Sequence, residues 1–296
     1  MNLYRTMLFV PGNDAGKLLD AGIYKADSVI FDLEDAVSVN EKDAARDLVK
    51  NALKYNTYPC PVGVRINHIS TPYGYDDLAA ILSAKPSFIR LPKAEEVEDI
   101  LKVAEIITQA EQQYGYEPNS IKIFLTVETA KGVMNSYAIA SCSKRVIGMG
   151  LGAEDLAADL QAMRTPSGEE ILFCKSQLLL SARAAGIMAL DNVFADVKNE
   201  AAFLAETAMG KQLGFNGKSI IHPNQVALVH RVYTPTTAEV EKARQVLLAY
   251  AQALANKSGV IALNGKMIDG PIVARAERIV QYAQAVGMVK GGDVID

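Results

Sequence analysis

Two short apolar segments of this chain are each followed by acidic residues. Ile123–Val127 leads directly to Glu128, and Val146–Met149 leads through a glycine-rich stretch to Glu154 and Asp155. The segment between the two runs has helical composition, so the unit reads strand, helix, strand. In a parallel unit of this kind, both groups of acids lie at the carboxyl edge of the sheet.

Carboxylates that meet at one edge of a sheet can supply the oxygen ligands of Mg²⁺. The sequence therefore predicts that Glu128 and Asp155 could hold this ion together. The alternative is that each acid begins a helix, where the macrodipole favours a negative charge. These residues alone leave both interpretations open.

Other charged residues also occur at or just beyond the ends of predicted strands. They are Asp32, Glu34, Arg65, Lys93 and Lys218. In a barrel of parallel strands the carboxyl ends form one rim, and active sites lie there because side chains from different strands converge. Loops are polar in general, which could explain any one of these residues. The recurrence of acids and bases at this edge nevertheless predicts the rim of an enzyme.

Eight predicted strands alternate with helical segments along most of the chain. The strands are Thr6–Val10, Ser28–Phe31, Val62–Ile66, Phe88–Leu91, Ile123–Val127, Val146–Met149, Asn192–Ala195 and Gly217–Ile221. This alternation predicts a parallel sheet with both faces covered by helices. Eight repeats favour a TIM (β/α)₈ barrel over an open, Rossmann-like sheet, and no GxGxxG follows the first strand.

Two regions are expected, a barrel over residues 1–233 and a C-terminal helical extension over residues 234–296. The extension has two amphipathic helices, Thr236–Asn256 and Ile272–Ala285. The loop between them, GVIALNGKMIDGP, is either a lid over a rim or a plain helix connector.

The composition is that of a cytoplasmic globular protein. Of the 296 residues, 50% are hydrophobic and 22% charged, and the net charge is −4, which argues against a nucleic-acid or anionic-membrane surface. Cys60, Cys142 and Cys174 lack CxxC spacing and are expected to be reduced thiols. No apolar run approaches the length of a membrane span, so no membrane partner is expected.

Eight motifs occur in order between Met7 and Pro271: MLFVPGND, VIFDLEDAV, VRIN, IRLPK, TVETAKGV, GLGAEDL, LGFNGKSIIHPNQ and LNGKMIDGP. The set resembles the citrate lyase β-subunit family, within the wider group of Mg²⁺-dependent HpcH/HpaI-type aldolases and lyases. The resemblance implies a TIM barrel with a C-terminal helical extension, Mg²⁺ as cofactor and assembly as a homotrimer or hexamer. It also implies citrate lyase α and γ subunits as partners.

The resemblance implies a carbon–carbon lyase that cleaves a citryl thioester, on acyl carrier protein or CoA, to oxaloacetate and an acetyl thioester. Glu128 and Asp155 would hold Mg²⁺, with Glu128 close to the substrate, and Arg65 would bind substrate and take part in catalysis. Asp269 would do acid/base work, acting in its own or a neighbouring subunit, although it could equally be a helix-start residue ahead of Pro271.

Three further residues are candidates for supporting the site or for binding the substrate's carrier. Asp32 and Glu34 could hold a metal-bound water or orient Arg65. Lys218 could contact the pantetheine or phosphate of the substrate's carrier, with packing as the rival explanation.

The acyl group stays open at this point. A stand-alone citramalyl-CoA or malyl-CoA lyase would use the same metal and the same arginine, because a few contacts separate such thioesters. Two more distant possibilities are a non-catalytic scaffold that docks an acyl carrier and an aldolase that acts on free keto acids.

Overall fold

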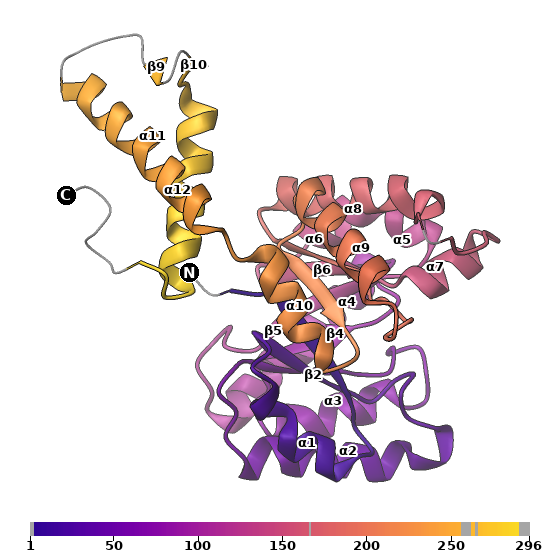
Figure 1. The fold of residues 1–296 in the computed structure, drawn as a ribbon. Helices are drawn as coiled ribbons and strands as arrows, with labels where there is room; N and C mark the ends of the chain where they lie inside the picture. Colours follow the sequence, from indigo (N-terminus) through magenta and orange to yellow (C-terminus); the bar gives the residue numbers. More distant parts are fainter. Residues whose placement is uncertain (1–2, 166, 256–261, 264–265, 290–296) are drawn as a thin grey trace. The chain divides into compact units, whose positions relative to one another are not determined.

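Eight parallel strands form a closed barrel in the computed structural model, which describes residues 3–165, 167–255, 262–263 and 266–289 (Figure 1). The strands are β1 (Thr6–Pro11), β2 (Ser28–Asp32), β3 (Val62–Arg65), β4 (Phe88–Leu91), β5 (Lys122–Val127), β6 (Val146–Leu151), β7 (Met188–Asp191) and β8 (Gly217–Ile220). Each pairs with the next, and β1 also pairs with β8, with Thr6 beside Lys218. This closure confirms the TIM barrel and excludes the open sheet.

Helices follow the strands and pack around the barrel (Figure 1). They are α1 (Ala15–Asp20), α2 (Lys42–Tyr55), α3 (Gly74–Leu82), α4 (Val97–Tyr114), α5 (Ala130–Met134), α6 (Ser136–Ser141), α7 (Ala153–Asp159), α8 (Leu172–Ala185), α9 (Glu200–Leu213) and α10 (Asn224–Tyr233), with 3₁₀ turns η1 (Ala21–Tyr24), η2 (Val39–Glu41) and η3 (Glu169–Ile171). None of the helices in the described ranges combines the length and apolar character that crossing a membrane requires.

The predicted seventh strand was misplaced. The structure puts β7 at Met188–Asp191, ahead of the expected Asn192–Ala195. Gly186 ends α8 in the left-handed conformation, at φ 71°, so the chain turns from helix to strand within two residues. Asn192 therefore begins the loop at the rim.

Large side chains fill the barrel interior because glycines on neighbouring strands leave room for them. Phe88 and Phe124 belong to the buried cluster inside the barrel. A Cβ on Gly63 would lie 2.2 Å from the Phe88 ring, and one on Gly148 would lie 2.3 Å from the Phe124 ring. The glycines on β3 and β6 are therefore what allow two aromatic rings to share this core.

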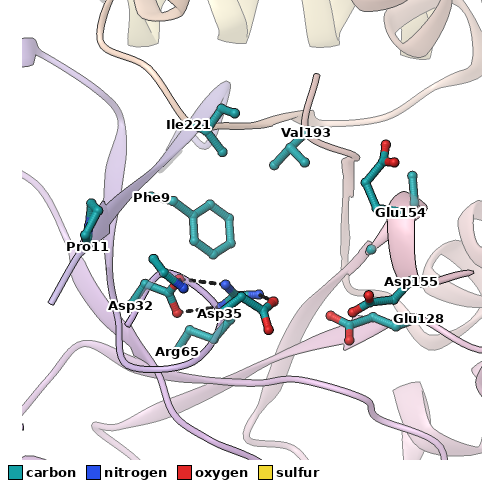
Figure 2. A pocket seen from close by; sticks show the side chains of 13 residues that line it. Phe9, Pro11, Asp32, Asp35, Arg65, Glu128, Glu154, Asp155, Val193 and Ile221 are labelled. Atoms are coloured by element: carbon teal, nitrogen blue, oxygen red, sulfur yellow. Dashed lines mark hydrogen bonds and ion pairs between the residues drawn. The ribbon is translucent and has the colours of Figure 1, made fainter. Parts of the chain in front are cut away.

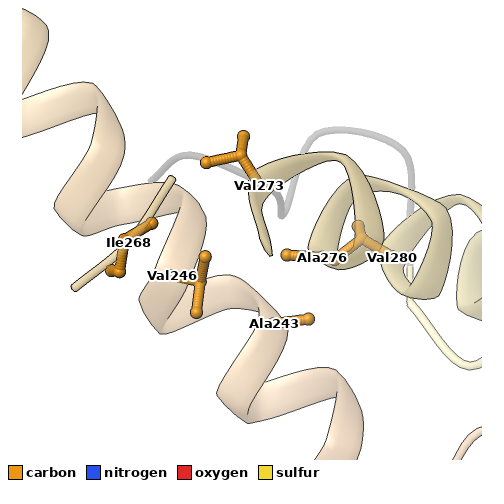
Figure 3. Close-up of a cluster of buried hydrophobic side chains, with 6 residues drawn as sticks. All are labelled: Ala243, Val246, Ile268, Val273, Ala276 and Val280. Carbon is orange, nitrogen blue, oxygen red and sulfur yellow. The ribbon is translucent and has the colours of Figure 1, made fainter. Parts of the chain in front are cut away.

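The structure divides into two compact units, one of which is the barrel, Tyr4–His230. The other unit contains α11 (Thr237–Ala255) and α12 (Gly270–Ala285), with a two-stranded antiparallel pair, β9 (Ala262–Leu263) and β10 (Lys266–Met267). Its own apolar core consists of Ala243, Val246, Ile268, Val273, Ala276 and Val280 (Figure 3). The expected extension over residues 234–296 also includes residues 256–261, 264–265 and 290–296, which lie outside the described part.

Candidate active site

A cavity of about 380 Å³ opens at the carboxyl ends of the barrel strands (Figure 2). It is lined by Phe9, Pro11, Asp32, Asp35, Ala36, Arg65, Glu128, Gly152, Ala153, Glu154, Asp155, Val193 and Ile221. Five of these residues carry carboxylates and one carries a guanidinium. The lining is therefore strongly acidic, with a single cation of its own.

Arg65, the last residue of β3, is held by the end of β2. Its Nε donates to Asp32 Oδ1 at 2.7 Å and its Nη2 donates to Asp32 Oδ2 at 2.6 Å, which makes a two-pronged ion pair. Glu34 and Asp35 lie 3.0 and 3.1 Å from its Nη1. Burial opposes the arginine's charge, but these carboxylates outweigh it and raise the pKa of Arg65. The guanidinium is therefore fully charged and fixed in one orientation.

Asp32 and Glu34 are the two buried acids beside this arginine. Asp32 is almost fully buried, and its carboxylate also accepts the backbone N–H groups of Glu34 and Ala36. Glu34 is buried too, and burial raises its pKa to about 7 against the opposing attraction of Arg65. Lys42 donates to the backbone oxygens of Leu33 and Glu34 and so holds the whole turn after β2.

Glu128 follows β5 directly and carries an oxygen without a partner. The residue is 2% exposed, and its Oε2 is buried without a hydrogen bond. Burial is the main reason that the pKa of Glu128 rises to about 8; Glu34 and Asp155 add repulsion, and Arg65 works in the opposite direction. Figure 2 shows the carboxylate of Glu128 beside that of Asp155.

Gly152, where β6 meets α7, makes space for Glu128. A Cβ at this position would lie 2.5 Å from Glu128 Cγ. Asp155 lies in the first turn of α7, as the helix-start interpretation expected, and also lines the cavity; its role as a metal ligand stays a prediction. The neighbouring Glu154 instead pairs with Arg164 at 3.1 Å. Figure 2 shows Glu154 apart from the Glu128–Asp155 pair.

The residues at this end of the cavity fit a magnesium ion. A buried carboxylate oxygen without a partner, beside a second carboxylate, is a ligand set that a hard dication satisfies. The described residues contain no group of three or more acidic, histidine or cysteine side chains gathered for a metal. Two protein carboxylates suffice for Mg²⁺, which commonly keeps its remaining positions for substrate and water.

The structure does not bring Lys218 to the cavity. Lys218 is fully buried, 3.2 Å from Asp191 Oδ2, and also pairs with Glu206 on α9. Along β8 the side chains alternate, and Ser219 points into the barrel, where its hydroxyl accepts a bond from Arg90. Lys218 therefore faces outward to α9, and the predicted contact with the carrier has no support in this geometry.

Asp269 belongs to the second compact unit. Its carboxylate accepts the backbone N–H of Ile272 at 3.2 Å and caps α12, with Pro271 in the first turn. Locally it is therefore the helix-start residue that one sequence interpretation expected. Its acid/base role stays a prediction.

A buried cation near the cavity that the sequence-based prediction did not name is Arg90 on β4. It is 1% exposed, and its guanidinium bonds Thr126 Oγ1 at 2.8 Å inside the barrel. Burial lowers the pKa of Arg90 to about 9, as does repulsion from Arg65, against attraction from Glu128 and Asp32. The signal was available, because an arginine two positions after Phe88 in a buried strand points to the same face.

A second cavity of about 510 Å³ adjoins the first. The two share Phe9, Pro11 and Ile221 in their linings. The second is also lined by Lys17, Tyr24, His222 and Asn224, from α1, η1, the segment after β8 and the start of α10. The space at this rim therefore continues past the carboxylates towards a cationic and aromatic wall.

Comparisons with known proteins place this chain among enzymes. The family model described as HpcH/HpaI aldolase/citrate lyase matches residues 5–223. Citrate lyase subunit beta of Haemophilus influenzae is 43% identical over 286 residues, 96% of this chain and 98% of the relative. A (3S)-malyl-CoA thioesterase of Cereibacter sphaeroides is 33% identical over 96% of this chain and 95% of its own length.

A solved structure also matches nearly the whole chain. It is protein CitE from Mycobacterium tuberculosis in complex with magnesium, acetoacetate and coenzyme A. The TM-score is 0.79 at 30% sequence identity, and the match covers 95% of this chain and 98% of that protein. The likeness therefore includes the C-terminal part as well as the barrel.

Proposed function

The chain belongs to the HpcH/HpaI aldolase/citrate lyase family, and on that premise we propose that it is a Mg²⁺-dependent citryl thioester lyase, a citrate lyase β subunit. The reaction would cleave a citryl group, carried on acyl carrier protein or CoA, to oxaloacetate and an acetyl thioester. The observation that carries the proposal is the cavity in which Arg65, held by Asp32, lies with Glu128 and Asp155.

The charge of this cavity suits such a substrate once a metal ion offsets the acids of the lining. A citryl group brings carboxylates into a lining with five acids and one arginine, so the acids would repel it without a further cation. Glu128 and Asp155 would hold a magnesium ion, which when bound would neutralise them and polarise the oxygens of the keto acid that is released.

Arg65 is suited to the charge that develops in the reaction. Breaking the carbon–carbon bond leaves its electron pair on the thioester fragment as an enolate. A guanidinium already fixed by Asp32 can donate hydrogen bonds to such an oxygen without reorganising at the moment of cleavage. The buried pair with Asp32 therefore serves orientation, and the remaining N–H groups can face the substrate.

Two proton transfers complete the reaction. The hydroxyl proton must leave as the keto group forms, and a proton must reach the enolate carbon to give the acetyl group. We assign this acid/base work to Asp269, on the resemblance of LNGKMIDGP to the family's motif. Asp269 is exposed and uses one carboxylate oxygen for its helix cap, so the other oxygen can still accept a proton.

The adjoining cavity supports a carried substrate over a free acid. A thioester arm is long, and the space beyond Phe9 and Ile221 would accommodate it. Lys17, which pairs with Asp14 at 2.9 Å, and His222 give that wall groups that can donate hydrogen bonds to a phosphate-bearing arm. We extend the proposal to partners of the same kind, namely citrate lyase α and γ subunits and further copies of this chain as a trimer or hexamer.

The test is release of oxaloacetate from citryl-CoA and from carrier-bound citryl, each with Mg²⁺ and with excess chelator. Metal-dependent release from either substrate is expected. No release from any thioester would leave a scaffold that docks the carrier, and turnover of free citrate or another free hydroxy acid would indicate an aldolase that needs no thioester.

A second candidate is a stand-alone citramalyl-CoA or malyl-CoA lyase. The relative named for (3S)-malyl-CoA, 33% identical over almost the whole chain, favours including these substrates. Assays with citramalyl-CoA and malyl-CoA in parallel decide between the two functions. Cleavage of these alone would keep the mechanism and replace the citryl group.

A further inference from the structure

Arg90 is a buried cation without an acidic partner, directly beneath the candidate active site. It forms no ion pair with any carboxylate of the described chain. Its hydrogen bonds go to Thr126 Oγ1 at 2.8 Å, Met7 Sδ at 3.1 Å and Ser219 Oγ at 3.4 Å. A buried guanidinium is costly when it is left with such weak partners, so its position needs a reason.

Two aromatic rings supply part of that reason. The Arg90 guanidinium lies 4.8 Å from the centre of the Phe9 ring and 5.0 Å from that of Phe124. Arg65 lies 5.0 Å from the centre of the same Phe9 ring. One ring is thus shared by two guanidiniums, the buried one and the one at the site. The negative face of a π system favours both cations, which otherwise repel each other.

Backbone register places the two arginines beside each other. Arg65 on β3 pairs directly with Arg90 on β4, and Phe9 lies near both on β1. Side-chain alternation sends both arginines to the inner face of the barrel. A Cβ on Gly150 would lie 3.1 Å from Arg90 Nη2, so this glycine also leaves room for the buried guanidinium. Figure 2 shows Phe9 above Arg65 at the wall of the cavity.

We propose that Arg90 and Phe9 are positioning residues that hold the Arg65 guanidinium through the shared Phe9 ring, in addition to its ion pair with Asp32. The expected effect on catalysis rests on the proposed function, whereas the positioning of Arg65 by Phe9 and Arg90 does not. Asp32 fixes the plane of Arg65 through two hydrogen bonds, and the Phe9 ring, which also contacts Arg90, limits how far the Arg65 guanidinium can shift. Arg65 would then meet the developing enolate from a fixed position.

A double-mutant cycle tests the coupling. Arg90→Lys keeps the charge but loses the planar fork, and it should lower kcat roughly ten- to a hundredfold, because small displacements of a catalytic group have effects of this size. The change in KM should be smaller, since Arg65 acts mainly on the transition state. In an Arg65→Lys background, the same Arg90→Lys change should lower kcat by less than about twofold, because the residue that Arg90 positions has been replaced.

Arg145→Lys is the matched control. Arg145 is also a buried arginine next to a strand, but it pairs with Glu111 at 2.6 Å and precedes β6, at the opposite end of the barrel. Its substitution should lower the melting temperature without changing kcat, and its effects should be the same whether Arg65 is intact or replaced by lysine. If Arg90→Lys lowers kcat by the same factor with Arg65 intact and with Arg65→Lys, as a purely structural change would, the proposal is overturned.

A second readout needs neither metal nor activity. In full-length protein labelled with ¹⁵N-arginine, the Nε–H signals of Arg65 and Arg90 are assigned by their loss in the two lysine variants. Phe9→Leu should move both signals, Arg90→Lys should move that of Arg65, and Arg145→Lys should move neither. An unmoved Arg65 signal in the first two variants overturns the inference. If the unaltered protein cleaves no thioester, the proposed function fails, and these spectra still decide the positioning role.

Discussion

The charge of Glu128 is the most pH-sensitive feature of the site. Its pKa in the folded protein is about 8, well above the ordinary value of 4.5, because the residue is buried beside other acids. The unfolded chain therefore releases this proton at a lower pH than the folded chain does. The contribution of Glu128 to the free energy of unfolding is favourable below pH 4.5 and is lost as the pH rises towards 8. The metal-free protein should therefore be destabilised over this range.

Glu128→Gln should remove most of this loss. The amide keeps the shape of the side chain but has no charge to bury, so the variant's free energy of unfolding without metal should be higher near pH 8 by on the order of a few kcal/mol. A shallower slope should remain, because the pKa of Glu34 is also raised, to about 7. Urea unfolding in chelator at pH 5, 6, 7 and 8 measures both effects.

Glu154→Gln is the control for that series, because Glu154 lines the same cavity but pairs with Arg164. It should keep the slope of the unaltered protein. Mg²⁺ should stabilise the unaltered protein increasingly as the pH rises and should not stabilise Glu128→Gln, since metal binding competes with the proton. Equal pH slopes in the unaltered protein and Glu128→Gln would contradict the buried-charge account.

Asp32 should matter to catalysis more than any other contact of Arg65. Asp32→Asn removes the charge and turns an amide N–H₂ towards the guanidinium, so the two-pronged pair is lost. We expect kcat/KM for the thioester to fall roughly ten- to a hundredfold. Asp35→Asn changes a 3.1 Å contact of a carboxylate that is 59% exposed, and should cost less than about threefold. Steady-state kinetics of the pair measure the difference, and equal losses would refute it.

The sequence allowed prediction of site residues that lie at the carboxyl ends of strands. It did not lead to Arg90, which lies inside the barrel. Arg65, Glu128 and Asp155 line one cavity. Arg90 is buried inside the barrel, and its partners are a threonine, a serine and a methionine from three other strands. Strand alternation gives the inward direction of Arg90, but its contacts with three other strands depend on closure of the barrel, which no local pattern predicts.

At the scale of elements, side-chain alternation decides which residues of a strand reach the site. On β5 the inward positions Phe124 and Thr126 continue directly to Glu128. On β8 the same rule turns Ser219 inward and Lys218 outward to α9. The sequence-based prediction considered only how near a residue lies to a strand end. It did not consider whether the side chain points inward or outward, which explains why it placed Lys218 at the rim.

The misplaced seventh strand has a related cause. Asp191 is the last residue of β7, whereas the predicted strand began at the next residue, Asn192. The apolar part of β7 is short and begins two residues after Gly186, which ends α8. Pairing of β7 with β6 and β8 fixes this strand, and such pairing is a tertiary constraint that the local pattern does not contain.

The junction of β6 with α7 should be intolerant of any side chain. Gly152 has φ −91°, which alanine adopts without strain, so only the close approach to Glu128 opposes Gly152→Ala. Glu128 must then move, and the affinity for Mg²⁺ should fall about tenfold or more. Calorimetric titration with Mg²⁺ measures it. Gly16→Ala is the control, since its Cβ would approach nothing nearer than 3.5 Å, and it should bind Mg²⁺ normally. Normal binding by Gly152→Ala would show that Glu128 is not a ligand.

At the scale of the whole molecule, the residues proposed for the reaction are divided between the two compact units. The barrel, Tyr4–His230, contains the cavity, the arginines and the two carboxylates suited to a metal. Asp269, the residue proposed for proton transfer, belongs to the other compact unit. Binding of Mg²⁺ and orientation of Arg65 should therefore be properties of the barrel, whereas turnover should require both units.

Asp269 offers a clean separation of its two roles. Asp269→Asn keeps an oxygen that can cap α12 but cannot take up a proton, whereas Asp269→Ala loses the cap as well, at a cost of about 1 kcal/mol. If Asp269 does the acid/base work, both variants should lose activity by roughly a hundredfold or more while Mg²⁺ binding is unchanged. If it only starts the helix, Asp269→Asn should match the unaltered protein in both activity and melting temperature.

Mixing then shows whether one copy completes the site of another. Arg65→Ala impairs the barrel and Asp269→Asn impairs the second unit, so each variant alone should be inactive. When the two are unfolded together and refolded as a mixture, sites shared between copies would combine one intact barrel with one intact Asp269 and recover up to about a quarter of the activity in a randomly mixed assembly. Refolded unaltered protein sets the full scale, and each variant refolded alone sets the background. Activity at that background would mean that Asp269 serves the barrel of its own chain, and the proposed site would then be complete within one copy.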